Sequence, residues 1–351
     1  TITDKPVRTI IYTHSHPDHR GGAGAFRDTV EEIIAFKART EPLDGYGRIA
    51  AALNQRGEFQ FGYELTDEEN ISQGIGPREG KAVGDGVYDF MSPTTVYDVD
   101  TTTRTIDGVT MELTAAPGEI DDQLFVWLEE DKVMISGDNY YGCWPNLYAI
   151  RGTQYRDIAQ WIKTLEKILS YPAEALLPGH TAPLIGRDQI LEVVGNFKNA
   201  IASVFDQTLD CLGRGLTLAE TVESVRLPEE LRDKEYLGEY YGTVEWSVKG
   251  IYNGYVGWFD GDAAHLMPCP RREFSAAVLE LAGGPDKLLA KALSCLEKGE
   301  SQLALELLEL LGGEAQSGKI KEVKRRALLA RAAQMTSANA RHYYICSAKE
   351  I

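Results

Sequence analysis

The sequence contains few cysteines, and they are scattered. The odd number, the wide spacing and the lack of a Cys-x-x-Cys pair exclude a disulfide framework and a cysteine-ligated zinc site. This usage favours a reducing compartment, so we expect a cytoplasmic protein, with a periplasmic or secreted location as the alternative. The five cysteines of the 351 residues are Cys143, Cys211, Cys269, Cys295 and Cys346.

Long apolar runs and an excess of basic residues are also missing. No apolar run approaches the ~20 residues that a membrane-spanning helix needs, and no signal peptide is recognisable, so we expect no membrane span. Lys and Arg number 36 against 53 Asp and Glu, which gives a formal net charge of −17. Because a nucleic-acid-binding face normally carries a basic excess, we expect no nucleic-acid partner. An anionic ligand would have to be attracted by local charges.

Histidines, in contrast, are concentrated at one place. Three of the six fall in the window His14-Ser15-His16-Pro17-Asp18-His19, directly after the β-branched and apolar run Thr9-Ile10-Ile11-Tyr12. This arrangement predicts a strand that delivers three imidazoles and a carboxylate to a loop at its carboxyl end. Imidazole nitrogen and carboxylate oxygen are preferred ligands of zinc and similar metal ions. The window therefore predicts a metal site, with a solvated His-rich turn as the alternative.

The pattern His-x-His-x-Asp-His resembles the metal-binding signature of the metallo-β-lactamase superfamily. The resemblance implies an αββα sandwich and three further ligands placed after later strands. Each match by itself could also be an ordinary turn residue. In chain order the matches are Glu119 in Ala116-Pro117-Gly118-Glu119, Asp138 after Val133-Met134-Ile135-Ser136-Gly137, and His180 after Ala175-Leu176-Leu177-Pro178-Gly179.

The same resemblance implies how these ligands divide between two metal ions. It assigns His14, His16 and Glu119 to one ion. It assigns Asp18, His19 and His180 to the other, with Asp138 between them. We expect two zinc ions per chain, although iron or manganese would also accept this set of ligands.

The superfamily commonly has a His at the position of Glu119. With a carboxylate at this position, the sequence resembles the zinc-dependent alkyl sulfatase branch. Several further segments resemble that branch and not the superfamily at large. The resemblance implies hydrolysis of alkyl sulfate esters to alcohol and sulfate by a metal-bound hydroxide, with Asp18, Asp138 and Arg151 as catalytic residues. The segments are Gly137-Asp138-Asn139, Asn146 to Gly152, Arg156-Asp157, Tyr241 to Ser247 and Tyr255 to Gly261.

Four residues are candidates for contact with such a substrate. The planar guanidinium of Arg151 suits bidentate contact with sulfate oxygens, and Arg156 and Asn146 could support it. A surface ion pair for each arginine and a turn role for Asn146 are the alternatives. Tyr63, in the aromatic segment from Phe59 to Tyr63, could contact an aliphatic chain, with core packing as the alternative.

Some residues depart from the alkyl sulfatase pattern. That branch carries a Glu at the position of Asp138, and the context Pro178-Gly179-His180 is typical of the superfamily in general. These departures favour a second hypothesis, a hydrolase of phosphoesters, lactones or thioesters. A third hypothesis is a catalytically inactive assembly module that retains the metal loop.

Periodicity divides the chain into three parts. Residues 1–190 read as the α/β catalytic domain, and we expect its first sheet to be truncated because the first ligand already stands at residue 14. Residues 191–267 read as a helical extension that packs on the active site. Residues 268–351 read as tetratricopeptide-like helical hairpins, with a simple bundle as the alternative. By resemblance this part is a dimerisation domain, so we expect a homodimer. The helices are predicted at 274–281, 287–296, 302–311, 320–335 and 337–351.

Overall fold

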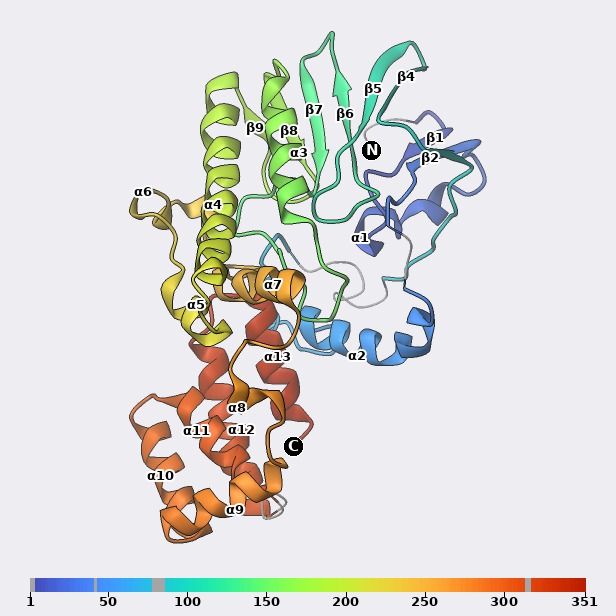
Figure 1. The fold of residues 1–351 in the computed structure, drawn as a ribbon. Coiled ribbons are helices and arrows are strands. Elements are labelled where there is room, and N and C mark those ends of the chain that lie inside the picture. Colours follow the sequence, from blue (N-terminus) through green and yellow to red (C-terminus); the bar gives the residue numbers. More distant parts are fainter. Residues whose placement is uncertain (1–3, 41–42, 78–85, 313–316) are drawn as a thin grey trace.

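Two β-sheets form the centre of the first half of the chain (Figure 1). The structure is a computed structural model and describes residues 4–40, 43–77, 86–312 and 317–351. The small sheet is parallel, in the order β1 (Thr9–Ile11), β2 (Glu32–Phe36) and β3 (Thr95–Tyr97). The large sheet follows chain order and contains β4 (Thr101–Ile106), β5 (Val109–Ala115), β6 (Leu124–Leu128), β7 (Val133–Gly137), β8 (Ala175–Pro178) and β9 (Leu184–Ile185).

The two sheets pack face to face through apolar side chains. Ile34 and Phe36 of β2 belong to one buried cluster with Leu113, Leu124 and Val126 of the large sheet. Alternate residues of each strand supply this cluster, as expected for sheets that bury one face against each other. The strand pair β7 and β8 is parallel, so their carboxyl ends lie side by side.

Helices α3 (Ile158–Ser170) and α4 (Arg187–Gly213) cover the outer face of the large sheet. Helix α7 (Val244–Val256) packs on α4, and all three contribute to the largest apolar core of the described chain. Asp157 caps α3 by accepting a hydrogen bond from the backbone N–H of Gln160 at 2.9 Å. The predicted boundary at residue 190 lies inside the first turn of α4, because that helix starts directly after Gly186 and packs on the sheet.

Short helices flank the small sheet on its other side. They are α1 (Pro17–Arg20) and the 3₁₀ turn η1 (Ala23–Phe26), whose Ala23 packs with Tyr12 and Ile33. The 3₁₀ turn η2 (Tyr46–Ile49) and helix α2 (Ala50–Phe61) follow. Helices and sheets thus form the predicted α/β sandwich.

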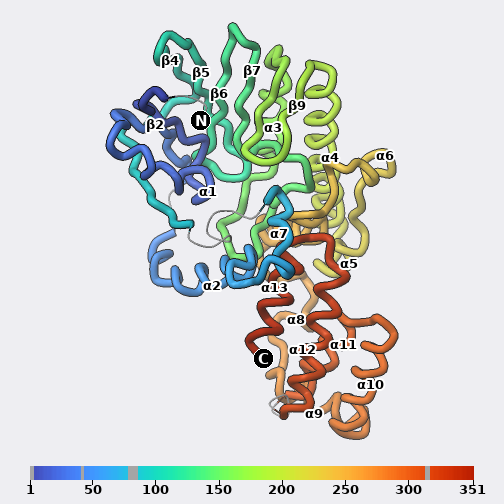
Figure 2. The backbone as a smooth tube through the Cα atoms, turned by 180° about the vertical axis from the view of Figure 1, so that it is seen from behind, coloured from blue at the N-terminus to red at the C-terminus, as the bar shows by residue number. Residues whose placement is uncertain are grey.

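The rest of the described chain is helical. Helices α5 and α6 lie beside α4, whereas the helices from α9 to α12 extend away from the sheets (Figure 2). Neighbouring helices from α9 to α13 contact each other in chain order and enclose a separate apolar core, so the predicted helical region is confirmed. Among the described residues, no helix is both long and apolar enough to cross a bilayer. The elements are α5 (Leu218–Ser224), α6 (Glu229–Arg232), η4 (Glu235–Leu237), α8 (Ala263–Leu266), α9 (Arg271–Ala282), α10 (Pro285–Glu297), α11 (Ser301–Glu309), α12 (Gly318–Ala333) and α13 (Ala338–Lys349).

Helix α13 returns toward the first half of the chain and packs against α2 (Figure 1). The rings of Phe59 and Tyr343 meet edge to face with centroids 5.3 Å apart. Lys349 forms an ion pair with Glu69 at 2.6 Å. Two segments at opposite ends of the sequence therefore lie side by side near the carboxyl ends of the strands.

Candidate active site

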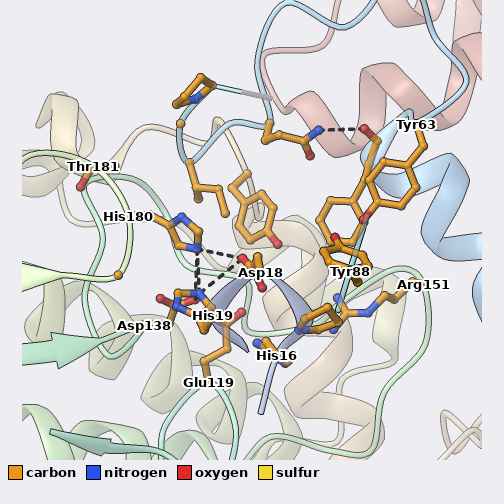
Figure 3. A pocket seen from close by; sticks show the side chains of 18 residues that line it. His16, Asp18, His19, Tyr63, Tyr88, Glu119, Asp138, Arg151, His180 and Thr181 are labelled. Atoms are coloured by element: carbon orange, nitrogen blue, oxygen red, sulfur yellow. Dashed lines mark hydrogen bonds and ion pairs between the residues drawn. The ribbon is translucent and has the colours of Figure 1, made fainter. Parts of the chain in front are cut away.

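The seven side chains predicted as metal ligands converge at one edge of the sandwich. Figure 3 shows all of them except His14. His14 and His16 follow β1, while Asp18 and His19 lie in the short helix α1. The other three follow strands of the large sheet, as the sequence predicted. Glu119 lies beyond the end of β5, Asp138 directly follows β7, and His180 lies two residues beyond β8.

One group of donors surrounds His19 and His180. Their Nε2 atoms face each other at 3.2 Å. The Oδ2 atom of Asp18 lies 3.3 Å from the first and 3.2 Å from the second of these nitrogens. The Oδ2 atom of Asp138 lies 3.2 and 3.3 Å from the same two nitrogens. Two imidazoles and two carboxylates thus point at a common volume.

A second group lies on the other side of Asp138. The Nε2 atom of His14 is 3.1 Å from Nδ1 of His16 and 3.7 Å from Oδ2 of Asp138. The donor atoms of His16, Glu119 and Asp138 all lie within 4.8 Å of one another. Asp138 therefore belongs to both groups, in agreement with the central place predicted for it.

Gly179 allows the His180 loop to approach this cluster. A Cβ atom at this position would overlap Oδ1 of Asp138 and would lie 2.8 Å from Cε1 of His19. The backbone N–H of Gly179 donates to the carbonyl of Gly137 at 3.0 Å, which ties the loop after β8 to the end of β7. Only glycine fits between these groups without displacing them.

The charges of the cluster depend strongly on its burial. Burial lowers the pKa of His14 to about 3 and holds the pKa of His16 well below its usual value. Burial alone would also lower the pKa of His19 and His180, but hydrogen bonds to Asp138 and Asp18 raise it to about 10 and about 9. Two imidazoles thus favour the neutral form that ligates metals, and two are held by carboxylates.

Arg156, which the sequence offered as a support for Arg151, lies behind the candidate ligand Glu119. Its side chain is buried behind Glu119, with Nη1 2.7 Å from Oε1 of that carboxylate, and Nη1 also donates to the carbonyl of Asn146. Arg156 does not line the cavity in this structure, because its guanidinium is engaged by Glu119 and Asn146. Its role as a substrate contact stays a prediction. Burial raises the pKa of Glu119 to about 7, while the charge of Arg156 opposes that rise.

The cluster opens into a cavity of about 710 Å³. Its lining includes the cluster residues His16, Asp18, His19, Glu119, Asp138 and His180, together with the predicted substrate contacts Arg151 and Tyr63. Asn146 is buried and does not line this cavity, and its contact with a substrate stays a prediction. In Figure 3, Arg151 lies beside Tyr63 and Tyr88, across from His180.

Several lining residues had not been identified from the sequence. They are Gln73, Ile75, Tyr88, Thr181 and Tyr241, whereas Phe61 had been a candidate together with Phe59 and Tyr63. The newly identified residues come from the segments that follow α2, from the His180 loop and from the turn before α7. No local pattern marks them, because only the tertiary fold brings these segments to the strand ends.

The residues of the cluster fit bound metal ions. Four imidazoles and three carboxylates supply nitrogen and oxygen donors, and these form three overlapping sets of three, each within 4.8 Å. The sets are His14, His19 and Asp138; Asp18, His19 and His180; and His16, Glu119 and Asp138. Buried carboxylates this close together repel one another unless cations compensate them. Mixed nitrogen and oxygen ligation suits zinc and other first-row ions.

Two family models match the chain. The model described as metallo-β-lactamase superfamily matches residues 2–180, and the one described as alkyl sulfatase dimerisation matches residues 217–351. The first match contains all seven candidate ligands. The second contains the helices from α5 to α13.

Individual relatives agree with these matches. The linear primary-alkylsulfatase of Pseudomonas sp. (strain ATCC 19151) is 34% identical over 363 residues, covering 100% of this chain and 68% of the relative. Alkyl/aryl-sulfatase BDS1 of Saccharomyces cerevisiae is 30% identical over 361 residues, covering 99% and 55%. A solved double mutant of the sec-alkyl sulfatase PisA1 matches with a TM-score of 0.87 at 25% identity, covering 99% and 57%. The chain thus spans between 55% and 68% of the length of these relatives.

Proposed function

Because the chain belongs to the metallo-β-lactamase superfamily and carries an alkyl sulfatase dimerisation region, we propose that it hydrolyses alkyl sulfate esters to alcohol and sulfate. The observation that carries the proposal is the cavity in which a metal-binding cluster faces Arg151 and an aromatic wall. The similarity to alkylsulfatases extends over the whole chain.

The proposed cofactor is a pair of zinc ions. His14, His16 and Glu119 would hold one ion and Asp18, His19 and His180 the other, with Asp138 serving both; iron or manganese would also suit these donors. When bound, the two ions would supply a nucleophile at neutral pH by lowering the pKa of a water molecule to about 7. Thr13 supports this arrangement, since its Oγ1 lies 3.1 Å from Nδ1 of His14 and leaves Nε2 directed at the cluster.

The protein's own side chains would bind and orient the ester. The Arg151 guanidinium carries a permanent positive charge and would hold the sulfate oxygens with charge-assisted hydrogen bonds. Phe61, Tyr63 and Tyr88 form an aromatic wall on the same side of the cavity and would take the alkyl chain. The substrate would then lie with its anionic end between Arg151 and the cluster.

Two carboxylates would have catalytic roles beside their ligand roles. Asp18 lies at the cavity and is partly exposed, with hydrogen bonds from His180 and His19 that keep its pKa well below the usual value despite burial. It would remain ionised and could accept a proton from the attacking water. Asp138 is almost fully buried and, as a member of both donor groups, would fix their positions relative to each other.

The helical region would form the contact between two copies of the chain. Large apolar side chains are exposed between α7 and α10, including Trp258, Met267 and Leu281, which are 72%, 89% and 88% exposed. Patches of this kind mark interaction sites in proteins. We propose a homodimer through this surface, which analytical ultracentrifugation of the Trp258→Glu and Met267→Glu double variant would test. Unchanged dimers in this variant would exclude the surface.

Elemental analysis combined with an ester assay tests the proposed function. We expect about two zinc ions per chain, release of sulfate from a medium-chain alkyl sulfate, and loss of that activity after chelation. Bound metal without release of sulfate would contradict the proposal that the substrate is an alkyl sulfate.

The departures at Asp138 and in the Pro178 to His180 segment favour a phosphoesterase, lactonase or thioesterase as the second candidate. Ranking the rates for sulfate, phosphate and acyl esters separates these candidates.

A further inference from the structure

The turn that carries Arg151 is fitted to the surface of helix α2. The backbone N–H of Gly152 donates to the carbonyl of Ala149 at 2.9 Å and closes the turn. Gly152 has a φ of +104°, and a Cβ atom there would lie only 3.0 Å from Cδ2 of Leu53 in α2. The turn therefore needs glycine for its conformation and for its close approach to the helix.

Two further side chains of α2 hold the backbone of this turn by hydrogen bonds. The Oε1 atom of Gln60 accepts from the N–H of Arg151 at 2.9 Å. Arg56 donates through Nε to the carbonyl of Arg151 at 2.8 Å and through Nη2 to the carbonyl of Ile150 at 2.6 Å. Arg56 and Gln60 are four residues apart and therefore lie on one face of the helix. Both backbone polar groups of Arg151 are thus bound by side chains of α2.

The end of the same helix also contacts the Arg151 side chain. Phe61 is the C-terminal residue of α2, and Cζ of Arg151 lies over its ring, 5.8 Å from the centroid. A guanidinium at this distance is attracted by the ring. Phe61 in turn stacks on Tyr63, with centroids 5.6 Å apart and an interplanar angle of 19°. The helix therefore contacts Arg151 at its backbone and at its charged end.

We propose that Gln60 and Arg56 are positioning residues that fix the reach of the Arg151 guanidinium into the cavity, so that α2 sets the recognition of the sulfate group. This inference rests on the proposed function, in which Arg151 binds that group. A displacement of about 1 Å in a binding residue can cost roughly 100-fold in rate. The hydrogen bonds that fix the backbone of Arg151 therefore affect how well its side chain binds the substrate.

The burial of Gln60 separates it from an ordinary helix surface residue. Its side chain is fully buried, at 0% exposure. Its backbone carbonyl oxygen lies 3.3 Å from Nδ1 of His342 in α13. Helix α13 thus supports the segment of α2 that holds Arg151. The N-terminal end of α13 also contacts a cavity residue, since Ser337 Oγ donates to the carbonyl of Tyr241 at 2.8 Å. Helix α13 therefore contacts both the segment that holds Arg151 and the cavity residue Tyr241.

The test compares Gln60→Met, which removes the acceptor at nearly equal volume, with Gln60→Glu, which keeps an acceptor oxygen. Gln55→Met is the matched control, because Gln55 is an exposed residue of the same helix that reaches Glu350 and not the turn. We expect Gln60→Met to raise KM for a medium-chain alkyl sulfate about tenfold with a smaller change in kcat, because an unpaired N–H is left behind. Gln60→Glu should restore most of this loss, and the control should match the unaltered protein.

A second background shows whether Gln60 acts through Arg151. In an Arg151→Ala protein, Gln60→Met should change KM less than twofold, because residues that act as one unit are not additive. An equal change in both backgrounds would overturn the inference, as would an unaltered KM in Gln60→Met. Arg56→Ala, at an exposed position that tolerates change, should raise KM about threefold and covers the case in which Gln60→Met does not fold.

Hydrogen exchange provides a readout that does not depend on the substrate. The amide of Arg151 should exchange faster in Gln60→Met than in the unaltered protein and in the control. If the Arg151 amide exchanges faster in Gln60→Met but the protein has no sulfatase activity, the hydrogen bond to Gln60 is supported and the proposed substrate is contradicted. If the exchange rate of this amide is unchanged, Gln60 does not fix the turn.

Discussion

The two sides of the cavity are built in different ways. The side with the candidate metal ligands comes from loops and a short helix that follow β1, β5, β7 and β8, all within one sandwich. The substrate side comes from α2, the turn at Arg151, the segment around Tyr88 and the turn at Tyr241, which are brought together by helix packing. Strand ends fix chemical groups rigidly, whereas the other side depends on contacts between distant segments. We therefore expect changes on the first side to abolish the chemistry and changes on the second to alter binding.

Removal of a shared ligand should have the largest effect. We expect Asp138→Ala to reduce the rate of ester hydrolysis on the order of 10³-fold, equivalent to about 4 kcal/mol, because both donor groups lose a carboxylate. Elemental analysis of the same protein should show lower zinc content. Full zinc content with normal hydrolysis in this variant would contradict the central place of Asp138.

Substitution of Arg156, which lies behind the candidate ligand Glu119, should weaken metal binding less than the loss of Asp138. Arg156→Met removes the buried partner of Glu119, whose carboxylate then lacks a compensating charge. We expect roughly 10- to 100-fold weaker metal affinity, measured by competition with a chelator. A lower free energy of unfolding, by about 3 kcal/mol, should accompany it. If Arg156 bound substrate instead, KM would rise while metal affinity stayed constant.

On the substrate side, Arg151→Ala should leave the metal content unchanged. The loss of charge-assisted hydrogen bonds should lower kcat/KM for an alkyl sulfate about 30-fold, mainly through KM. Arg151→Lys should recover part of this loss, since the charge remains but the planar fork does not. Steady-state kinetics and elemental analysis on the same samples distinguish this outcome from a loss of metal.

The smallest effect is expected at the aromatic wall. Tyr88→Ala should raise KM about fivefold for a long alkyl chain and hardly at all for a short one, because only the long chain reaches the lost apolar surface. A chain-length series of alkyl sulfates measures this difference. An equal rise for all chain lengths would place Tyr88 at the sulfate group instead.

The contrast between the two sides also explains what the sequence could predict. Each of the seven candidate ligands follows an apolar strand pattern within a few residues, so a local signal marks it, and the structure brings all seven together. Helices such as α10 and α12 were predicted within a few residues because their apolar periodicity is regular. The zinc ions and the roles of these residues stay predictions.

The direction of individual side chains and the contacts between distant segments could not be predicted from the sequence. Arg156 stands close to Arg151 in the chain, yet one guanidinium is buried against Glu119 and the other lines the cavity. Sequence proximity does not determine which way a side chain points when the intervening turn is irregular. No local pattern predicted the place of Gln60, because its contacts with Arg151 and His342 join α2 to segments far along the chain.

The packing of α2 on α13 has a consequence for the order of folding. Gln60 and His342 are separated by 282 residues, so their contact closes a very long loop. Such distant contacts form late, and a chain emerging from the ribosome at ~5–20 residues per second would expose α13 many seconds after the strands of the sandwich. All candidate ligands precede residue 181. A nascent chain would therefore bring its candidate metal ligands together well before it completes the surface proposed to bind the substrate.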